Sequence, residues 1–482
     1  MDSHPHYFNT LTRTVERFEP LSPERRDGTG RPVVGLYVCG PTVYDFGHLG
    51  NFRTFVFADL VRRHLEFRGF AVTHVMNITD VEDKIIRRVR ETGVPLHEFT
   101  AGYEAAFLED LDTLGCLRPH HLPRATEHLP QIIALIRKLE QRGLAYQTPD
   151  GSVYFSIAKY RGCGCVYGRL VNLNPEAQRV GERVASDEYD KAAAADFALW
   201  KARVPEDGVV FWDSPWGPGR PGWHIECSAM SMALLGPSFE LHLGGEDLAF
   251  PHHEDEIAQS EGSGEQPPGR PFVKHWMHAA HLLVEGRKMS KSLGNFLTVR
   301  DLVTRGHTGR EIRQLLLSAH YRGTFNFTAD GLDAARIALA RIDECLGKLQ
   351  DLAGDVPAPG PGTASPLETA VTIALDDDLN VSRAWAAVFE WVGHTNRAMS
   401  AGALGPAGAA SALAAWRRVD AVLGMGRPRT EEAPPEIRSL ADERAAAKKA
   451  RDFARADAIR MKLKSLGWIL EDTPKGPRLK RA

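Results

Sequence analysis

One stretch near the start of the chain constrains the fold more than any other. Residues 33–38 are an apolar run of strand length, bounded by a proline and followed by a glycine-bearing turn. Beyond the turn, apolar residues recur at helical spacing at Phe52, Val56 and Leu60. A strand, a turn and a helix in this order present backbone N–H groups and the helix dipole to a phosphate group. The stretch therefore predicts a ligand-binding edge of a parallel α/β sheet.

The turn itself carries residues that are unusual for a dinucleotide fold. It begins with Cys39, ends in the run His48-Leu49-Gly50-Asn51 and contains no GxGxxG pattern. A thiol and an imidazole at the carboxyl end of a parallel strand lie where α/β proteins place their chemistry. We therefore expect catalytic or ligand-binding side chains here.

The following residues continue the α/β pattern and then leave it. A second strand over residues 71–78 ends in Thr79-Asp80, and helices at 81–93 and 96–114 come next, which predicts a parallel sheet. The pattern then changes to that of an insertion, and the last third of the chain is helical. We therefore expect an α/β, Rossmann-type catalytic domain with an insertion, an all-α helical-bundle domain and a small C-terminal basic domain.

The same reading of the pattern predicts the domain boundaries. Two Pro/Gly-rich stretches, 353–366 and 426–435, have the composition of linkers. The expected parts are 1–119 and 201–299 for the halves of the catalytic domain, 120–200 for the insertion, 300–352 for a first helical region, 367–425 for the bundle and 436–482 for the C-terminal domain.

Four residues near predicted strand and helix ends form a plausible zinc set. His252 and Glu256 are four residues apart on a predicted helix, so both side chains leave the same face. Cys39 follows a strand, and Cys227 begins a helix after a Pro/Gly-rich loop. Two thiols, an imidazole and a carboxylate suit zinc. His253 fits the spacing as well as His252 does, and buried thiols without a metal remain an alternative.

A second group of residues suits phosphate groups. His48 and Asn51 lie at a helix N-terminus, and Lys288 and Lys291 flank Met-Ser in a loop bordered by Gly and Ser. Two such lysines can neutralise the charge that develops on a pyrophosphate leaving group, although a solvated basic loop has the same composition. Asp247 follows a Gly-Gly turn at a strand end, which suits an acceptor for a ribose hydroxyl.

Cysteine usage and charge bear on the compartment and the partners. Six cysteines in 482 residues make no disulfide framework, the start of the chain has no apolar leader, and no run is long enough to span a membrane; we therefore expect a cytosolic protein. The pair Cys163 and Cys165 is weak evidence for a metal, and structural or incidental cysteines are favoured. From Ala441 to Ala482, 12 Lys and Arg stand against six Asp and Glu, which indicates either a polyanion partner or a solvated helix.

The motifs described above resemble those of one enzyme family. The run His48 to Asn51 resembles the HIGH signature of class I aminoacyl-tRNA synthetases, and Lys288 to Ser292 matches their KMSKS motif letter for letter. Four segments together resemble cysteinyl-tRNA synthetases, namely YVCGPTVYD, PGWHIECSAM, GGEDLAFPHHEDE and EGRKMSKSLGN. The likeness runs in the family's order from about Tyr37 to the tail. Two departures are small, because Asn replaces the final His of HIGH and Leu replaces its Ile.

The resemblance implies a role for each candidate residue. It implies a zinc ion held by Cys39, Cys227, His252 and Glu256, and a cysteine pocket lined by Thr79 and Trp223. It implies ATP binding by Gly47, His48, Asn51, Gly245, Asp247 and Lys291. It implies that catalysis depends on His48, Asn51, Lys288 and Lys291.

The resemblance also implies an activity and its partners. We expect ATP, accompanied by Mg²⁺, to drive the ligation of L-cysteine to tRNA(Cys) through cysteinyl-adenylate, with one zinc per chain selecting the cysteine thiolate. Residues 300–352 would then contact the tRNA stem and residues 436–482 the anticodon region. We expect a monomer that has no membrane partner.

Two other functions fit part of the sequence. A ligase of the same family that joins cysteine to an amino sugar would share the adenylation site, but such relatives are shorter and lack the basic tail. A non-enzymatic RNA-binding or zinc-sensing descendant of a synthetase would have no need of Lys288 and Lys291.

Overall fold

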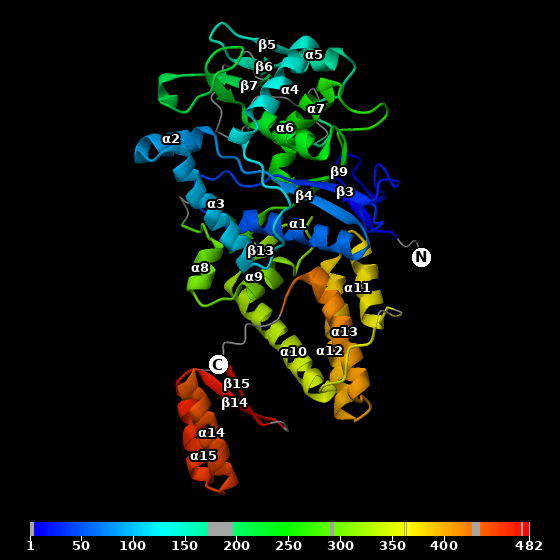
Figure 1. The fold of residues 1–482 in the computed structure, drawn as a ribbon, viewed down its shortest axis with the longest axis vertical. Helices are drawn as coiled ribbons and strands as arrows, with labels where there is room; N and C mark the ends of the chain where they lie inside the picture. The colour runs from blue at the N-terminus through cyan, green and yellow to red at the C-terminus, as the bar shows by residue number, and fades with distance from the viewer. Residues whose placement is uncertain are drawn as a thin grey trace. The chain divides into compact units, whose positions relative to one another are not determined.

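The computed structural model (Figure 1) divides the chain into two compact units. The first comprises residues 1–340, 361–394 and 415–425, and the second comprises 341–360, 395–414 and 426–482. The residues that the structure describes are 4–171, 196–289, 294–360, 362, 364–426, 434–473 and 476–481.

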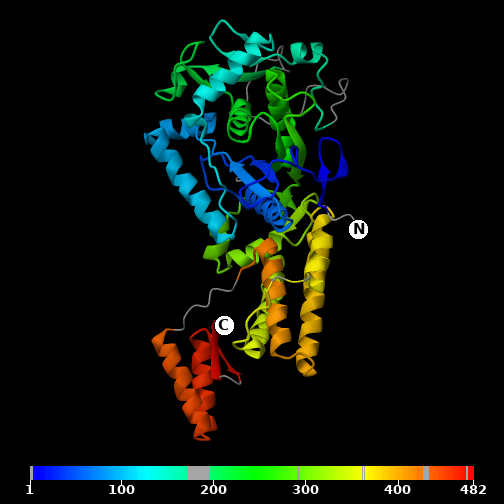
Figure 2. The ribbon, with the colours of Figure 1, turned by 45° about the vertical axis from the view of Figure 1, so that its right-hand side comes forward.

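A four-stranded parallel sheet forms the centre of the first unit. Its strands are β3 (Val33–Val38), β4 (Ala71–Met76), β9 (Phe239–Gly245) and β10 (Val273–Ala279), in the order β10-β9-β3-β4. Figures 1 and 2 show helix α1 (Leu49–Phe67) on one face of the sheet and α6 (Trp223–Leu235) on the other. The predicted α/β fold with a parallel sheet is confirmed.

The sequence explains why this sheet is covered on both faces. Residues Leu36, Tyr37 and Val38 are fully buried in succession, as expected for a parallel strand with helices on either side. Helix α1 follows β3 after the turn. Most of its residues are buried, because the helix lies between the sheet and later helices. Burial on both faces of the sheet leaves the strand ends as the places where side chains can meet a ligand.

The insertion forms an antiparallel sheet of its own. Its strands are β5 (Ala145–Gln147), β6 (Val153–Phe155), β7 (Phe197–Ala202) and β8 (Gly219–Pro221), with α4 (Leu129–Gln141) and α5 (Ile157–Gly162) beside them. Trp200, Phe155 and Ile136 are among the fully buried residues of its core. The apolar run 209–212 forms no strand, because Val209 is 87% exposed and only Trp212 makes a bridge to the sheet.

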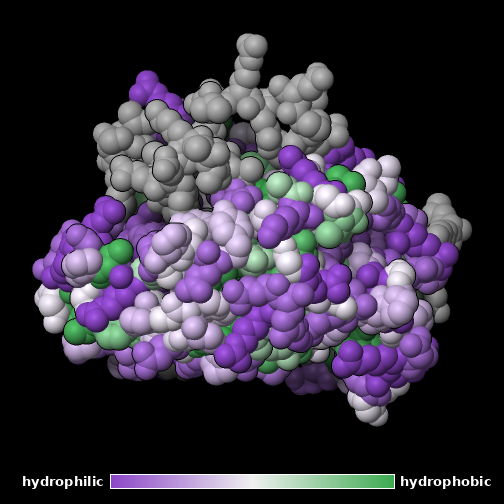
Figure 3. All heavy atoms as spheres, turned by 90° about the horizontal axis from the view of Figure 1, so that it is seen from above, coloured by the Kyte–Doolittle hydropathy of each residue, from purple (hydrophilic) through white to green (hydrophobic). Residues whose placement is uncertain are grey.

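The surface of the insertion is that of an ordinary solvent-facing region. Figure 3, which looks down on this end of the molecule, shows mostly hydrophilic and intermediate side chains, with apolar ones scattered among them. The polar stretch 172–195, assigned from its sequence to the insertion, lies outside the described residues.

The chain forms further helices and strands outside the two sheets described above. A hairpin of β1 (His6–Asn9) and β2 (Thr14–Arg17) adjoins β10, since the backbone N–H of Thr10 donates to the carbonyl oxygen of Trp276 at 2.8 Å. The remaining elements are α2 (Asp83–Thr92), α3 (Leu96–Thr113), α7 (Glu254–Ser263), β11 (Leu282–Val284), β12 (Arg287–Lys288), α8 (Val299–Thr304), α9 (Gly309–Leu316), β13 (Phe325–Phe327), α10 (Ala329–Ala353), α11 (Pro366–Asp376), α12 (Val381–Ser400) and α13 (Pro406–Leu423).

The C-terminal segment of the second unit has a small core of its own. It contains α14 (Pro435–Lys449), α15 (Phe453–Ser465), β14 (Trp468–Thr473) and β15 (Gly476–Arg481). Ala456, Ile459 and Leu463 of α15 are buried, whereas Phe453 at its first position is 63% exposed and Leu466 just beyond its end is 46% exposed.

Two further observations concern the connections and membranes. The predicted linker 426–435 falls mostly on residues 427–433, which lie outside the described part of the chain. In the described residues, no helix combines the length and the apolar character needed to cross a bilayer.

Candidate active site

Four buried side chains converge next to the carboxyl end of β3. Cys39 directly follows this strand, Cys227 lies in α6, His252 in the short turn before α7, and Glu256 in α7. Their ligand atoms all lie within 4.8 Å of one another, and each side chain is at most 6% exposed. Residues from three regions of the sequence thus form one cluster, as their positions at strand and helix ends predict.

The distances within this cluster can be compared with those of a tetrahedral zinc site. Ordinary zinc bond lengths place two sulfurs about 3.8 Å apart, a sulfur and an oxygen about 3.6 Å apart, and a nitrogen and an oxygen about 3.4 Å apart. The Cys39 and Cys227 Sγ atoms are 3.9 Å apart, and Cys39 Sγ is 3.7 Å from Glu256 Oε1. His252 Nε2 is 3.2 Å from the same oxygen. The donor set and its spacing therefore fit zinc.

A second set of donors shares two members with the first. Cys39 and Glu256 also lie within 4.8 Å of His242 and His253, and Cys39 Sγ is 3.3 Å from His253 Nε2. Glu256 separates the two sets, because its Oε1 faces His252 while its Oε2 is 3.0 Å from His242 Nε2. Sequence spacing leaves open whether His252 or His253 is the ligand, and in the structure each of them forms a donor set with Cys39 and Glu256.

Polar side chains around the cluster hold its members in place. His252 Nδ1 lies 2.8 Å from His224 Nδ1, and His224 Nε2 lies 3.4 Å from Asp255 Oδ2. On the other side, His253 Nδ1 is 2.7 Å from His278 Nε2. Such partners fix the orientation of metal-ligating imidazoles. The sequence alone missed these supporting roles.

His242 is the supporting residue for which the sequence does carry a signal. It interrupts the apolar strand β9, is fully buried and stacks on Trp276 with ring centroids 4.4 Å apart. A polar residue in the middle of a buried strand needs a partner, and Glu256 is that partner. Strand position and burial together could therefore have singled out His242.

Mutual contacts shift the protonation of the four side chains. Hydrogen bonding to Cys39 lowers the pKa of Cys227 to about 6, whereas burial raises the pKa of Cys39. Burial alone would lower the pKa of His252, but hydrogen bonds to Cys227 and Glu256 raise it to about 10. Burial would raise the pKa of Glu256, but His242 and His252 lower it to about 2. The cluster thus holds two anionic donors, Cys227 and Glu256, and two protons, on Cys39 and His252, that a metal would displace.

The two residues predicted to line the amino-acid pocket border this cluster. Trp223 is the first residue of α6, is 36% exposed and stacks on His252 with centroids 4.4 Å apart. Thr79 follows β4, and its hydroxyl donates to Glu226 Oε2 at 3.3 Å. Gly222 allows this arrangement, since a Cβ there would lie 2.0 Å from the carbonyl oxygen of Ala198.

His48 and Asn51 build the N-terminus of α1 together. The backbone N–H of Asn51 donates to His48 Nδ1 at 3.1 Å, and the backbone N–H of His48 donates to Asn51 Oδ1 at 3.0 Å. Because Nδ1 accepts, the neutral ring carries its proton on Nε2. Burial lowers the pKa of His48, which favours this neutral form. The helix start therefore offers the imidazole Nε2 proton and the positive end of the helix dipole to an anion, while the backbone N–H groups of Leu49 and Asn51 are bonded within the protein.

The other predicted nucleotide residues lie on neighbouring segments. Asp247 is exposed just after β9, and its charge opposes the burial effect on the pKa of His48. A Cβ on Gly245 would lie 2.4 Å from Asp247 Oδ1, and a Cβ on Gly47 would lie 2.9 Å from the Phe52 ring. Both glycines thus permit close packing at this corner.

The lysine loop is described only in part. Lys288 is exposed at the end of β12, and the methyl carbon of Met289 lies 3.1 Å from the Cβ position of Gly50. This places the start of the loop against the N-terminus of α1. Lys291 belongs to residues 290–293, which lie outside the described part.

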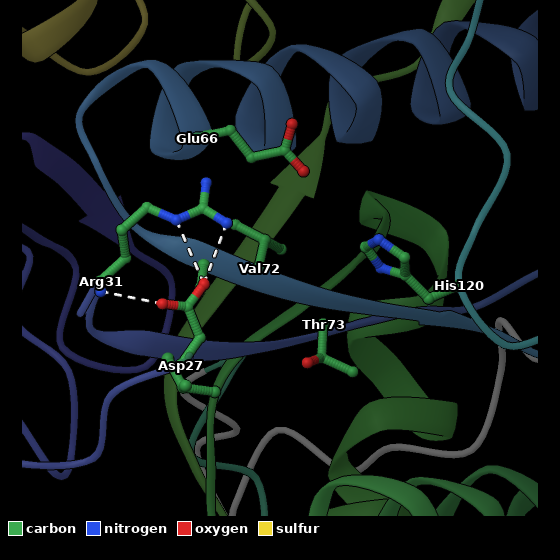
Figure 4. Close-up of a pocket in the computed structure, with 8 residues that line it drawn as sticks. Asp27, Arg31, Glu66, Val72, Thr73 and His120 are labelled. Atoms are coloured by element: carbon green, nitrogen blue, oxygen red, sulfur yellow. Dashed lines mark hydrogen bonds and ion pairs between the residues drawn. The ribbon is translucent and has the colours of Figure 1, made fainter. Parts of the chain in front are cut away.

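Two features lie away from this edge. A cavity of about 260 Å³ lies at the amino end of β4, and Figure 4 shows residues that line it, among them Asp27, Arg31, Thr73 and His120. Arg31 is paired there with Asp27. Cys163 and Cys165 are free and exposed beyond the end of α5. Neither feature contributes a predicted site residue.

Comparison with known proteins decides the family. The model of the class I (C) tRNA synthetase catalytic domain matches residues 28–337, and that of the DALR domain matches residues 370–426. A cysteine–tRNA ligase of Chlamydia pneumoniae is 45% identical over 98% of each chain. The chain belongs to the cysteinyl-tRNA synthetase family. A further member of this family, the cysteine–tRNA ligase of Solibacter usitatus, is 46% identical over 98% of this chain and 99% of its own.

Solved structures of more distant synthetases share the fold. The methionyl-tRNA synthetase of Mycobacterium tuberculosis in complex with methionyl-adenylate superposes with a TM-score of 0.57 at 14% identity, covering 82% of this chain and 90% of its own. A leucyl-tRNA synthetase of Agrobacterium radiobacter K84, in a ternary complex with tRNA, gives 0.58 at 13% identity, covering 83% and 85%. At this identity the likeness concerns the fold alone. The family resemblance found in the motifs is confirmed.

Proposed function

We propose that the chain joins L-cysteine to tRNA(Cys) in two steps that consume ATP. The cysteine carboxylate attacks the α-phosphate of ATP, which forms cysteinyl-adenylate and releases pyrophosphate. A hydroxyl of the terminal adenosine of tRNA then attacks the acyl carbon, and AMP leaves. Family membership supports this reaction. The protein mainly positions the reactants and stabilises charge.

One observation carries the choice of cysteine as the amino acid. The cluster of Cys39, Cys227, His252 and Glu256 borders Trp223 at the same sheet edge as the N-terminus of α1. A soft donor set beside the nucleotide corner suits a substrate that itself ends in a thiol. An apolar pocket would distinguish cysteine from serine or alanine only about 10- to 200-fold.

We assign the metal to zinc and the imidazole ligand to His252. The first donor set offers two sulfurs, whereas the set with His253 offers one, and zinc sites favour thiolates. In this arrangement His242 and His224 support Glu256 and His252. Zinc bound there would accept the substrate sulfur as a further ligand in its thiolate form. Serine lacks such a donor at neutral pH, and alanine has none.

The chain's own residues accommodate ATP at the adjacent corner. His48 offers its Nε2 proton to phosphate oxygens, and the positive end of the α1 dipole favours their negative charge. Asp247 accepts a ribose hydroxyl in this proposal, which its exposure just after β9 supports. Gly47 and Gly245 permit the close packing of the protein at this corner. Lys288 and Lys291 then meet the charge on the pyrophosphate, with Mg²⁺ bound to ATP.

The predicted division of labour beyond the catalytic domain belongs to the same proposal. Residues 300–352 contact the tRNA stem, and 436–482 contact the anticodon region of tRNA(Cys). The basic composition of the tail supports this. A chain ending near Pro434 should form cysteinyl-adenylate normally and charge tRNA more weakly, with a defect that deepens as salt is raised. Normal charging by this truncated chain would refute the role of the tail. We infer a monomeric, cytosolic enzyme.

The reaction is tested by two assays on the full chain. Cysteine should drive the exchange of pyrophosphate into ATP, and tRNA(Cys) should become charged with cysteine in the same preparation. Exchange without charging, together with consumption of cysteine in the presence of an amino sugar, would favour the related amino-sugar ligase. Absence of cysteine-dependent exchange would refute the proposal.

A further inference from the structure

The acidic run Asp376-Asp377-Asp378 has no role in the function proposed above, yet it lies at a junction. Helix α11 ends at Asp376, and α12 begins at Val381. Between them Asp378 adopts a left-handed backbone conformation with φ of 51° and is only 4% exposed. A buried carboxylate in an unusual backbone conformation requires specific partners.

The partners of Asp378 come from two other parts of the first unit. Its Oδ1 accepts from the Phe8 backbone N–H at 2.8 Å and from the Tyr321 hydroxyl at 2.7 Å. Its Oδ2 accepts from Arg322 Nε at 2.7 Å. The backbone carbonyl oxygen of Asp378 is 2.8 Å from His320 Nε2. One residue thus holds the turn 320–323, which leads from α9 into β13.

The same turn is held from its other side by Arg53 of α1. Arg53 is 3% exposed, and its guanidinium donates to the carbonyl oxygen of Gly323 at 2.6 Å and to that of His320 at 3.2 Å. The Tyr321 ring stacks on Phe57 of α1, with centroids 4.3 Å apart and planes 11° apart. A cavity of about 10 Å³, large enough for one water molecule, borders Arg53, Phe57 and Tyr321. The turn and α1 are therefore joined by the hydrogen bonds of Arg53 and by the ring stack.

Arg53 also holds the segment that leads to the lysine loop. Its guanidinium donates to the carbonyl oxygens of Ala280 at 2.6 Å and His281 at 2.8 Å, directly after β10. This segment continues through β11 and β12 to Lys288. The backbone N–H of Ala280 in turn donates to the carbonyl oxygen of Tyr321 at 2.8 Å. The Arg53 guanidinium thus fixes the base of the β11–β12 hairpin against α1, the helix that His48 caps.

We propose that Asp378 is a positioning residue for the nucleotide site. It acts through Tyr321, Arg322 and the turn 320–323, to which Arg53 is hydrogen-bonded. Figure 1 shows helix α9 and strand β13, which the turn connects, beneath α1. Loss of the carboxylate frees the turn, and the base of the hairpin then shifts relative to the N-terminus of α1. Because His48 and Lys288 lie at the two sides of this joint, the shift misplaces groups that contact ATP. The cysteine cluster has no direct contact with this joint in the described residues and keeps its geometry. The inference rests on the adenylation proposed above.

The test compares Asp378→Asn with Asp377→Asn in the full chain. The asparagine has nearly the same shape but loses its charge and presents an amide group to Arg322. Asp377 is the matched control, since its side chain is 62% exposed and its ion pair with Arg383 spans 3.9 Å. Pyrophosphate exchange should show a KM for ATP raised on the order of tenfold in Asp378→Asn, or an equivalent loss in kcat, with the KM for cysteine unchanged. Asp377→Asn should match the parent chain.

Active-site titration separates positioning from a loss of folded protein, because a merely structural role lowers the number of active sites and leaves both KM values unchanged. Tyr321→Phe provides a second variant, which removes one bond to Asp378 and retains the ring stack. In the double variant with Asp378→Asn, the effects on the KM for ATP should be less than additive. Unchanged ATP kinetics per active site in both single variants would overturn the inference. Because the parent chain is assayed alongside, a failure of the proposed function appears as absent exchange in the parent itself.

Discussion

The cysteine cluster and the nucleotide corner share one sheet edge but are built in opposite ways. In the cluster, each candidate ligand is buried and contacts the others, so that the side chains are oriented before any substrate binds. At the corner, Lys288 and Asp247 are exposed, and within the described residues the ammonium group of Lys288 has no ion pair. In the function proposed above, the amino acid is therefore selected by donors that are oriented in advance, whereas the chemistry on ATP depends on exposed groups that the bound nucleotide orders.

Removal of a ligand from the cluster should have the largest effect. Cys227→Ala should bind no zinc and should lose adenylate formation by a factor on the order of 10⁴, because the remaining buried donors are left without their partner. Elemental analysis and pyrophosphate exchange measure the two losses. Cys163→Ala, which removes an exposed thiol, should retain one zinc per chain. Full zinc content in Cys227→Ala would remove this residue from the ligand set.

Removal of a charge from the corner should act on the rate alone. Lys291→Ala should slow adenylate formation by a factor on the order of 10²–10³ and leave cysteine binding nearly intact, because the charge it meets is largest in the transition state. Single-turnover assays measure the rate, and Arg287→Ala on the exposed strand β12 is the control. Unchanged adenylation would exclude Lys291 from the mechanism.

A change in the support of the cluster should have an intermediate effect on the metal. His242→Gln removes the imidazole that binds Glu256 Oε2 at 3.0 Å. Zinc affinity, measured by competition with a chelator, should fall about 10- to 100-fold, as is usual when such a partner is lost. The ATP dependence of any remaining exchange should not change. Altered ATP kinetics with normal zinc affinity in this variant would show that the cluster and the nucleotide corner do not act independently.

The smallest effect concerns pH at the corner. Burial lowers the pKa of His48 below its usual value, and the charge of Asp247 opposes this only in part. More than half of His48 therefore stays neutral as the pH falls from 8 to the ordinary imidazole value of about 6.5. The single-turnover rate at saturating substrates should change less than about twofold over this range. A rate that halves at or above pH 6.5 would show that an unshifted imidazole controls the step.

The sequence predicted the parts of the site that depend on local pattern. Cys39 and Thr79 were placed correctly because strand ends can be recognised from apolar runs and glycine-bearing turns. The contacts of His242 and Asp378 could not be predicted, since their partners lie far away in the chain and no periodicity connects them. The apolar composition of residues 209–212 likewise does not decide their burial, since Val209 is exposed and burial is set by tertiary packing.

The central claim, that a metal in the cluster selects the cysteine thiolate, is tested most directly by the visible spectrum of the cobalt-substituted protein. Cobalt bound by Cys39, Cys227, His252 and Glu256 should give absorption bands that change when cysteine is added and stay constant when serine is added at the same concentration. Bands that ignore cysteine would show that the substrate sulfur does not reach the metal, and they would contradict this account of selectivity.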